Sequence, residues 1–168
     1  GRNTQALLAR TMRTETILVT MPPFVLEDPS DESLWNLVAA LRLGIEHQFG
    51  GSIGNIDLDV IAHPGRGERA LLLSDQIPGG TGYLMELANE ESMWDLLAGA
   101  AAVLEECPCQ EEGLSACHRC LLPHVPYSRR SHLRRDLASE VLHDLLGTDP
   151  RAGTMTWEVE HSAIDATG

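Results

Sequence analysis

The residues of this sequence best suited to chemistry are four cysteines within 14 positions of one another. Cys107 and Cys109 form a C-x-C pair, and after seven intervening residues Cys117 and Cys120 form a C-x-x-C pair. Thiolates carried on short turns can fold back on a single ion, so this spacing is typical of a tetrahedral site with four sulfur ligands for zinc. Because four sulfurs leave no coordination position open, we expect one Zn²⁺ with a structural rather than a catalytic role.

Two alternatives stay open for these cysteines. Disulfide bonds would also consume the thiols, but Cys107 and Cys109 are too close in the chain to pair without strain, and no export signal is visible. His118 lies inside the C-x-x-C pair and is an alternative ligand to one of the sulfurs. The loop has few apolar residues to bury, so a bound ion would supply the free energy that orders it, on the order of 10 kcal/mol in small zinc modules.

A glycine-rich segment between an apolar run and a helical pattern is the second candidate site. It reads Asp75-Gln-Ile-Pro-Gly79-Gly80-Thr81-Gly82-Tyr. One interpretation is an anion cradle, in which the glycines let backbone amides approach a phosphate. The segment lacks the lysine of a P-loop and the spacing of the dinucleotide fingerprint. We favour a structural turn that requires positive φ, with Thr81 as the helix N-cap and Asp75 as a capping residue.

Charge is unevenly distributed along the chain. The net charge is −13, which excludes a nucleic-acid-binding protein that is basic over its whole surface. Residues 118–135 nevertheless hold five arginines and no acid, whereas residues 86–112 hold eight acids and no arginine. We call the five arginines the arginine strip: Arg119, Arg129, Arg130, Arg134 and Arg135.

The arginine strip has three interpretations. If the segment is helical, positions 130 and 134 share a face, and their guanidinium groups project outward together. They would then contact DNA phosphates, dock on an acidic neighbouring domain, or pair with the acidic helix around Glu105, Glu106, Glu111 and Glu112. We slightly favour the interdomain contact, because the chain as a whole is so acidic.

Hydrophobic periodicity predicts an α/β fold, a mixed sheet with packed helices, and places the zinc loop between the last two helices. Period-two and apolar runs predict strands over residues 16–20, 55–61 and 70–75, the last two as a hairpin, with an optional edge strand over 154–160. Helical stripes run from the Asp28-Pro29 cap to Phe49, over 84–106 with a restart at Asn89 or Ser92, and over 133–146.

The length of 168 residues fits one domain. We expect residues 1–13 to be a lead-in or linker, 14–147 a single zinc-binding domain, and 148–168 a polar tail. The chain begins Gly1-Arg2-Asn3 and shows neither a signal peptide nor a membrane-spanning apolar run. We therefore expect a cytoplasmic domain, without membrane contact, that belongs to a larger protein.

The Asp-x-x-Pro-Gly-Gly-Thr-Gly-Tyr turn, the cysteine loop and the arginine-rich final helix together resemble the MrfA-type zinc-binding domain over residues 14–147. The resemblance implies Cys107, Cys109, Cys117 and Cys120 as zinc ligands. It also implies an accessory role at the C-terminal end of superfamily 2 ATP-dependent DNA helicases, in DNA repair or phage defence. Helicase core domains, in the same or a partner chain, would be its partners, and the activity would be theirs because ATPase motifs are absent here.

The competing hypothesis is a small free-standing α/β enzyme. In that case the Gly79–Gly82 loop and Asp75 would form the active site, and zinc would only stabilise the fold. The sequence contains no serine elbow, no H-E-x-x-H motif and no obvious pair of catalytic carboxylates at helical spacing. ATPase and nuclease assays separate the two hypotheses, since an accessory domain should show neither activity.

Overall fold

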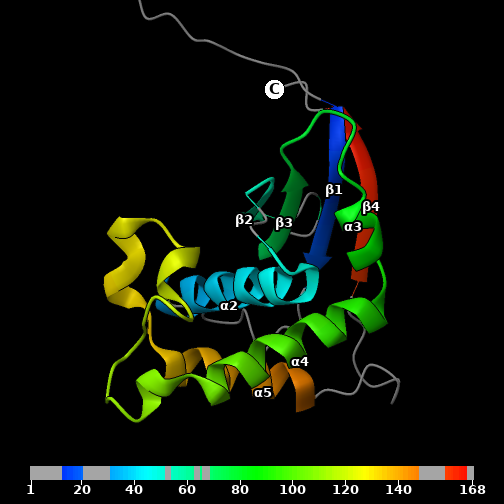
Figure 1. The fold of residues 1–168 in the computed structure, drawn as a ribbon. Coiled ribbons are helices and arrows are strands. Elements are labelled where there is room, and N and C mark those ends of the chain that lie inside the picture. Colours follow the sequence, from blue (N-terminus) through cyan, green and yellow to red (C-terminus); the bar gives the residue numbers. More distant parts are fainter. Residues whose placement is uncertain are drawn as a thin grey trace, which may run out of the picture.

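The computed structural model describes residues 13–20, 31–51, 54–62, 65, 69–147 and 158–165. A four-stranded sheet packs against a layer of helices (Figure 1). Its strands are β1 (Arg13–Thr20), β2 (Ile56–Ala62), β3 (Arg69–Asp75) and β4 (Glu158–Asp165), in the order β2-β3-β1-β4. The predicted α/β class is confirmed. The sheet itself is not mixed as predicted, since all three of its strand pairings are antiparallel.

Side-chain alternation explains where each strand lies in the sheet. Leu71 and Leu73 of β3 are buried, and the strand is hydrogen-bonded to both β1 and β2. On β2, Ile56 and Leu58 are buried whereas Asp59 is exposed, so this edge strand has one solvated face. The predicted β2–β3 hairpin is present, with Leu58 opposite Leu73.

The two ends of the predicted domain need correction. The structure starts β1 at Arg13, which the sequence had assigned to a linker. The predicted tail contains strand β4, which pairs with β1 from Arg13↔Asp165 to Thr20↔Glu158. The edge strand therefore exists but lies further along the chain than residues 154–160, because pairing with β1 fixes its register. The predicted helix cap at Asp28-Pro29 falls outside the described residues.

Within the described residues, four α-helices accompany the sheet, and none of them is long and apolar enough to cross a membrane. They are α2 (Asp31–Phe49), α3 (Tyr83–Leu87), α4 (Glu90–Glu106) and α5 (Arg135–Gly147). Short 3-10 helices η1 (Pro108–Gln110), η2 (Leu122–His124) and η3 (Tyr127–His132) lie between α4 and α5. The predicted restart is capped by Asn89, whose side chain accepts a hydrogen bond from the Ser92 amide at 2.8 Å.

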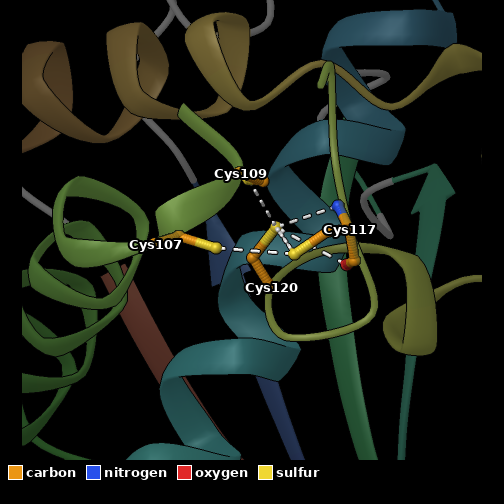
Figure 2. Close-up of side chains that lie close together, drawn as sticks. All are labelled: Cys107, Cys109, Cys117 and Cys120. Atoms are coloured by element: carbon orange, nitrogen blue, oxygen red, sulfur yellow. Dashed lines mark hydrogen bonds between the residues drawn. The ribbon is translucent and has the colours of Figure 1, made fainter. Parts of the chain in front are cut away.

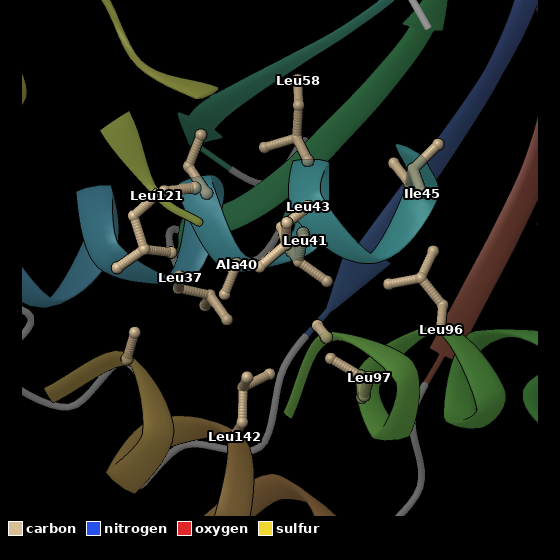
Figure 3. Close-up of a cluster of buried hydrophobic side chains, with 14 of the residues drawn as sticks. Leu37, Ala40, Leu41, Leu43, Ile45, Leu58, Leu96, Leu97, Leu121 and Leu142 are labelled. Atoms are coloured by element: carbon tan, nitrogen blue, oxygen red, sulfur yellow. The ribbon is translucent and has the colours of Figure 1, made fainter. Parts of the chain in front are cut away.

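Helix α2 is the centre of the molecule. The sequence predicted a single apolar stripe, but six consecutive residues, 36–41, are buried because the helix lies between the sheet and the pair α4 and α5 (Figures 1 and 3). Leu37 and Leu41 face Leu97 and Leu142 of those two helices. Gly44 allows the close approach of α4, since a Cβ there would lie 2.6 Å from the carbonyl oxygen of Leu96.

Candidate metal centre

The first cysteine pair is positioned by the end of α4. Cys107 is the C-cap of that helix, and its extended backbone turns the chain away from the helix axis. Pro108 follows at the start of η1, where its fixed φ favours the tight turn and its missing N–H leaves no donor unpaired. The turn brings Cys109 back beside Cys107, and the Cys109 carbonyl accepts a hydrogen bond from the Leu114 amide at 3.0 Å.

The second pair is carried by a compact turn. The amides of Cys120 and Leu122 both donate to the Cys117 carbonyl at 3.2 Å. Two further amides point at sulfur: that of Cys117 donates to Cys120 Sγ, and that of Arg119 donates to Cys117 Sγ, each at 3.3 Å. Amide donors of this kind stabilise negative charge on thiolates, which is the ligand form of cysteine.

The four sulfurs converge at one point, as Figure 2 shows. Their Sγ atoms all lie within 4.8 Å of one another. Three of the pairs are Cys107–Cys117 at 3.5 Å, Cys117–Cys120 at 3.7 Å and Cys109–Cys120 at 3.8 Å. A tetrahedral ion with Zn–S distances of about 2.3 Å places its sulfurs about 3.8 Å apart. The donor set and its spacing therefore fit one Zn²⁺.

Both alternative uses of these cysteines are excluded by the geometry. All four cysteines are free, and sulfurs 3.5 Å or more apart are not bonded, since a disulfide requires about 2.05 Å. His118 is exposed and does not belong to the convergent group. The sulfur ligands predicted from the spacing are the ones that the fold brings together.

Burial sets the proton affinity of the thiols. It raises the pKa of Cys109, helped by contacts with the neighbouring sulfurs, and it raises the pKa of Cys120 against the opposing effect of two backbone amides. At Cys117 burial acts in the same direction but is outweighed by the Arg119 amide and the other thiols, so the pKa is lowered. Metal binding must therefore displace protons from buried thiols, which makes it pH-dependent.

The metal centre is joined directly to the hydrophobic core. Cys120 and Leu121 are fully buried, and Leu121 packs beside Leu37 of α2 (Figure 3). Val125, on the other side of η2, is also buried. The chain that leaves the metal centre is thus buried on both sides of η2, which itself contacts α2.

The glycine-rich segment is organised around Asp75, a carboxylate with no solvent exposure. Its Oδ1 accepts a hydrogen bond from the Ile77 amide at 2.8 Å, and its Oδ2 accepts from the Thr81 amide at 2.5 Å and from the Thr81 hydroxyl. The Thr14 hydroxyl of β1 donates to the carbonyls of Asp75 and Ile77. Both carboxylate oxygens are therefore used inside the turn.

The turn needs its glycines, as the structural interpretation requires. Gly79, Gly80 and Gly82 have φ values of +90°, +80° and +87°, which side chains with a Cβ rarely adopt. The N-cap assignment was wrong: Gly82 precedes α3, and the Thr81 side chain is bonded to Asp75 instead. The sequence carries no signal that distinguishes Thr81 from Gly82 as the N-cap, because α3 has only five residues and its cap is a glycine.

The arginine strip does not form the single helical face predicted from the sequence. Arg129 and Arg130 belong to η3, Leu133 is extended, and Arg135 begins α5. Residues 130 and 134 therefore do not lie on successive turns of one helix. Arg134 binds its near neighbour Asp136, with Nη2 2.6 Å from Oδ2, and this pair holds the pKa of Asp136 below its usual range.

Two arginines of the strip lie over aromatic rings. The Arg129 guanidinium is 5.0 Å from the centroid of the Trp35 ring, and that of Arg130 is 5.5 Å from the Tyr127 ring. Within the described residues neither forms an ion pair with an acid. Arg119 is exposed on the second cysteine turn. The basic surface therefore contains aromatic rings as well as charge.

Asn36 supports this surface and was missed by the sequence analysis. It is fully buried in α2, where its Nδ2 donates to the His132 carbonyl at 3.0 Å and its Oδ1 accepts from the Arg134 amide at 2.8 Å. These two bonds fix the junction of η3 and α5 to α2. The available signal was a lone polar residue within an apolar helical stripe.

Comparison with known proteins agrees with this geometry. The family model of the MrfA Zn-binding domain matches residues 37–121, from the core of α2 to the residue after the last cysteine. No curated protein and no solved structure matches the chain. The matched half contains all four convergent cysteines, and the chain therefore belongs to the MrfA Zn-binding domain family, with a Cys₄ site for one Zn²⁺.

Proposed function

We propose that this chain is a non-catalytic accessory domain of an ATP-dependent DNA helicase acting in DNA repair or phage defence. The observation that carries the proposal is the closed donor set of the metal centre. Four sulfurs satisfy a tetrahedral ion completely, so neither water nor a substrate atom has a coordination position to occupy. The ion contributes folding free energy by tying the end of α4 to the chain that packs on α2.

The enzyme hypothesis is weakened by the state of Asp75. A general base must present a lone pair to its substrate, but this carboxylate is fully buried and both its oxygens accept hydrogen bonds from Ile77 or Thr81. Its role in the turn explains its position after β3 without any substrate. We therefore propose that the glycine-rich segment is structural.

The proposed DNA contact lies on the surface of η3. Tyr127 is 85% exposed, an unusual solvent exposure for an aromatic side chain, and Arg130 lies against its ring. An exposed ring on which a base can stack, flanked by arginines that reach phosphates, is the combination used by proteins that bind single-stranded nucleic acid. Within the described residues, Arg129 and Arg130 form no ion pair with the acidic segment 86–112, and Glu105 of that segment lies 3.0 Å from His143 of α5 instead.

Fluorescence anisotropy with a labelled dT20 oligonucleotide and a matched 20-base-pair duplex tests the contact. We expect tighter binding of the single strand, and we expect Tyr127→Ala to weaken it about fivefold or more, as loss of a stacked base predicts. Arg130→Ala should lower the salt slope by about one. Leu114→Ala, which truncates another exposed apolar side chain, is the matched control.

Unchanged binding in Tyr127→Ala and Arg130→Ala would refute the DNA contact and favour an interdomain role for the strip. The accessory role is tested separately by ATPase and nuclease assays on the zinc-loaded chain. Hydrolysis of ATP or cleavage of DNA that is lost in Asp75→Asn would refute the accessory role and support the enzyme hypothesis.

A further inference from the structure

A polar cleft of about 460 Å³ lies beside the metal centre, between α2, the start of β2 and η2. None of the four cysteines lines it. Arg42 and Glu46 reach it from α2, Asp57 from β2, and Pro123 and His124 from η2. Neither the zinc site nor the proposed DNA contact uses these side chains, so the cleft needs its own explanation.

The charges in the cleft do not cancel. Arg42 and Asp57 form one neutral pair, with Nη2 2.7 Å from Oδ1. Glu46 faces His124, but its Oε2 is 3.6 Å from Nε2, which is longer than a hydrogen bond. Burial lowers the pKa of His124 against the opposing effect of the Glu46 charge, and Arg42 acts in the same direction as burial, so the imidazole is a poor source of the positive charge that would neutralise Glu46.

Within the described residues, none of the cleft's own donors, on Arg42, Gln76 and His124, forms a hydrogen bond with the Glu46 carboxylate. Half of the Glu46 side chain is exposed, whereas only 9% of the His124 side chain is, so the imidazole is a fixed wall and the carboxylate is accessible. The Asp57 Oδ1 already accepts from Arg42 and from the Leu58 amide at 3.0 Å. A ligand that suits this arrangement supplies N–H donors and positive charge to Glu46, with an apolar part against Pro123.

We propose that this cleft binds an alkyl cation, an ammonium or guanidinium group at the end of a methylene chain. Glu46 pairs with the cationic group, the buried face of His124 limits the depth of entry, and the methylene chain lies along Pro123. Two sources carry this chemistry: an arginine or lysine side chain of a neighbouring protein domain, and a free polyamine. The experiment uses a separate probe for each source, an arginine peptide for the side chain and spermidine for the polyamine.

The test is an NMR titration of the ¹⁵N-labelled, zinc-loaded chain. One arm uses the peptide acetyl-Gly-Arg-Gly-amide with its citrulline analogue as the uncharged match, and the other arm uses spermidine. We expect the largest shifts at the amides around the cleft, those of Gly54, Gln76 and His124. Glu46→Gln should weaken binding about fivefold, the upper range for a partly exposed ion pair. Glu140→Gln, an exposed acid of α5, is the matched control.

Saturable binding of the arginine peptide at the cleft, lost in the citrulline analogue, supports a protein side chain as the natural occupant. Saturable binding of spermidine alone supports a free polyamine. Shifts spread over the acidic helix α4, equal weakening in Glu46→Gln and Glu140→Gln, or no binding in either arm would overturn the proposal. These outcomes do not depend on DNA binding, so they are independent of the proposed function.

Discussion

The cysteine loop and the glycine-rich segment solve the same structural problem in opposite ways. Each connects a buried element to a chain segment that must turn sharply, and neither has enough apolar side chains to fix its own conformation. The cysteine loop places four anionic sulfurs around one external cation. The glycine-rich segment places three N–H and O–H donors of Ile77 and Thr81 around one internal carboxylate.

The difference teaches where each loop's stability comes from. The carboxylate of Asp75 is covalently part of the turn, so its order depends on the chain alone. Burial raises the pKa of Cys109 and Cys120, and deprotonated sulfurs repel one another. The order of the cysteine loop therefore depends on an ion that the solution must supply. The folded conformation of the cysteine loop therefore depends on zinc, whereas that of the glycine-rich segment does not.

The largest expected effect is the loss of the cation. Cys120→Ser removes a fully buried ligand, and metal binding worth about 10 kcal/mol in small zinc modules is comparable with the whole stability of a domain. We expect loss of zinc by elemental analysis and loss of cooperative unfolding by circular dichroism. His118→Ala is the control and should retain both, since His118 lies outside the sulfur cluster. Stoichiometric zinc in the Cys120→Ser protein would contradict the assignment.

A smaller effect is expected at the carboxylate that organises the other loop. Asp75→Asn replaces one acceptor oxygen by a donor and leaves a buried N–H of Ile77 or Thr81 without its partner, at a cost of about 3 kcal/mol. Denaturant unfolding should show this loss while the zinc content stays at one per chain. Asp59→Asn, at an exposed position of β2, should change neither. Zinc loss in Asp75→Asn would show that the two loops are not independent.

The backbone of the glycine-rich segment offers a graded comparison. Alanine at Gly79 meets only the positive φ, because nothing lies within 4 Å of its Cβ, and should cost about 1 kcal/mol. Alanine at Gly80 meets the same φ and a Glu15 side chain 2.5 Å away, and we expect a cost of about 2 kcal/mol. Equal unfolding free energies for the two variants would show that Glu15 moves aside.

The smallest effect concerns pH and the segment just after the metal centre. Because burial lowers the pKa of His124, the unfolded chain binds a proton near pH 6.5 that the folded chain does not. Stability should therefore fall as pH decreases through 6.5 and stop falling below the folded pKa. His124→Gln should show a smaller drop in melting temperature between pH 7.5 and 6.0 than the parent. Titration of the thiols is common to both proteins and cancels in the difference.

The metal centre could be predicted because ligand identity and spacing are local properties of the sequence. Two short cysteine pairs are sufficient to specify a four-sulfur site, and the positive φ of Gly79, Gly80 and Gly82 follows from residue type in the same way. The strands and the α4 restart were also readable, because period-two alternation and the Asn89 cap act within a few residues.

The remaining features depend on contacts between distant parts of the chain. The hydrogen bonds of Asn36 reach residues 96 and 98 positions away, and they hold the end of η3 and the start of α5 against α2, a contact that helical periodicity cannot predict. The position of β4 follows from pairing with β1, not from its own pattern. The cleft likewise combines α2, β2 and η2, so no local motif marks it.

The pairing of β1 has a consequence for how the chain folds during synthesis. The strand is synthesised before both of its neighbours in the sheet, β3, where Thr16 pairs with Ser74, and β4, where it pairs with Ser162. Pairing must therefore wait until these partners emerge from the ribosome, and loop closure over such separations is slow compared with local helix formation. Its apolar residues Ile17 and Val19 then remain available for binding by a chaperone until β3 has emerged.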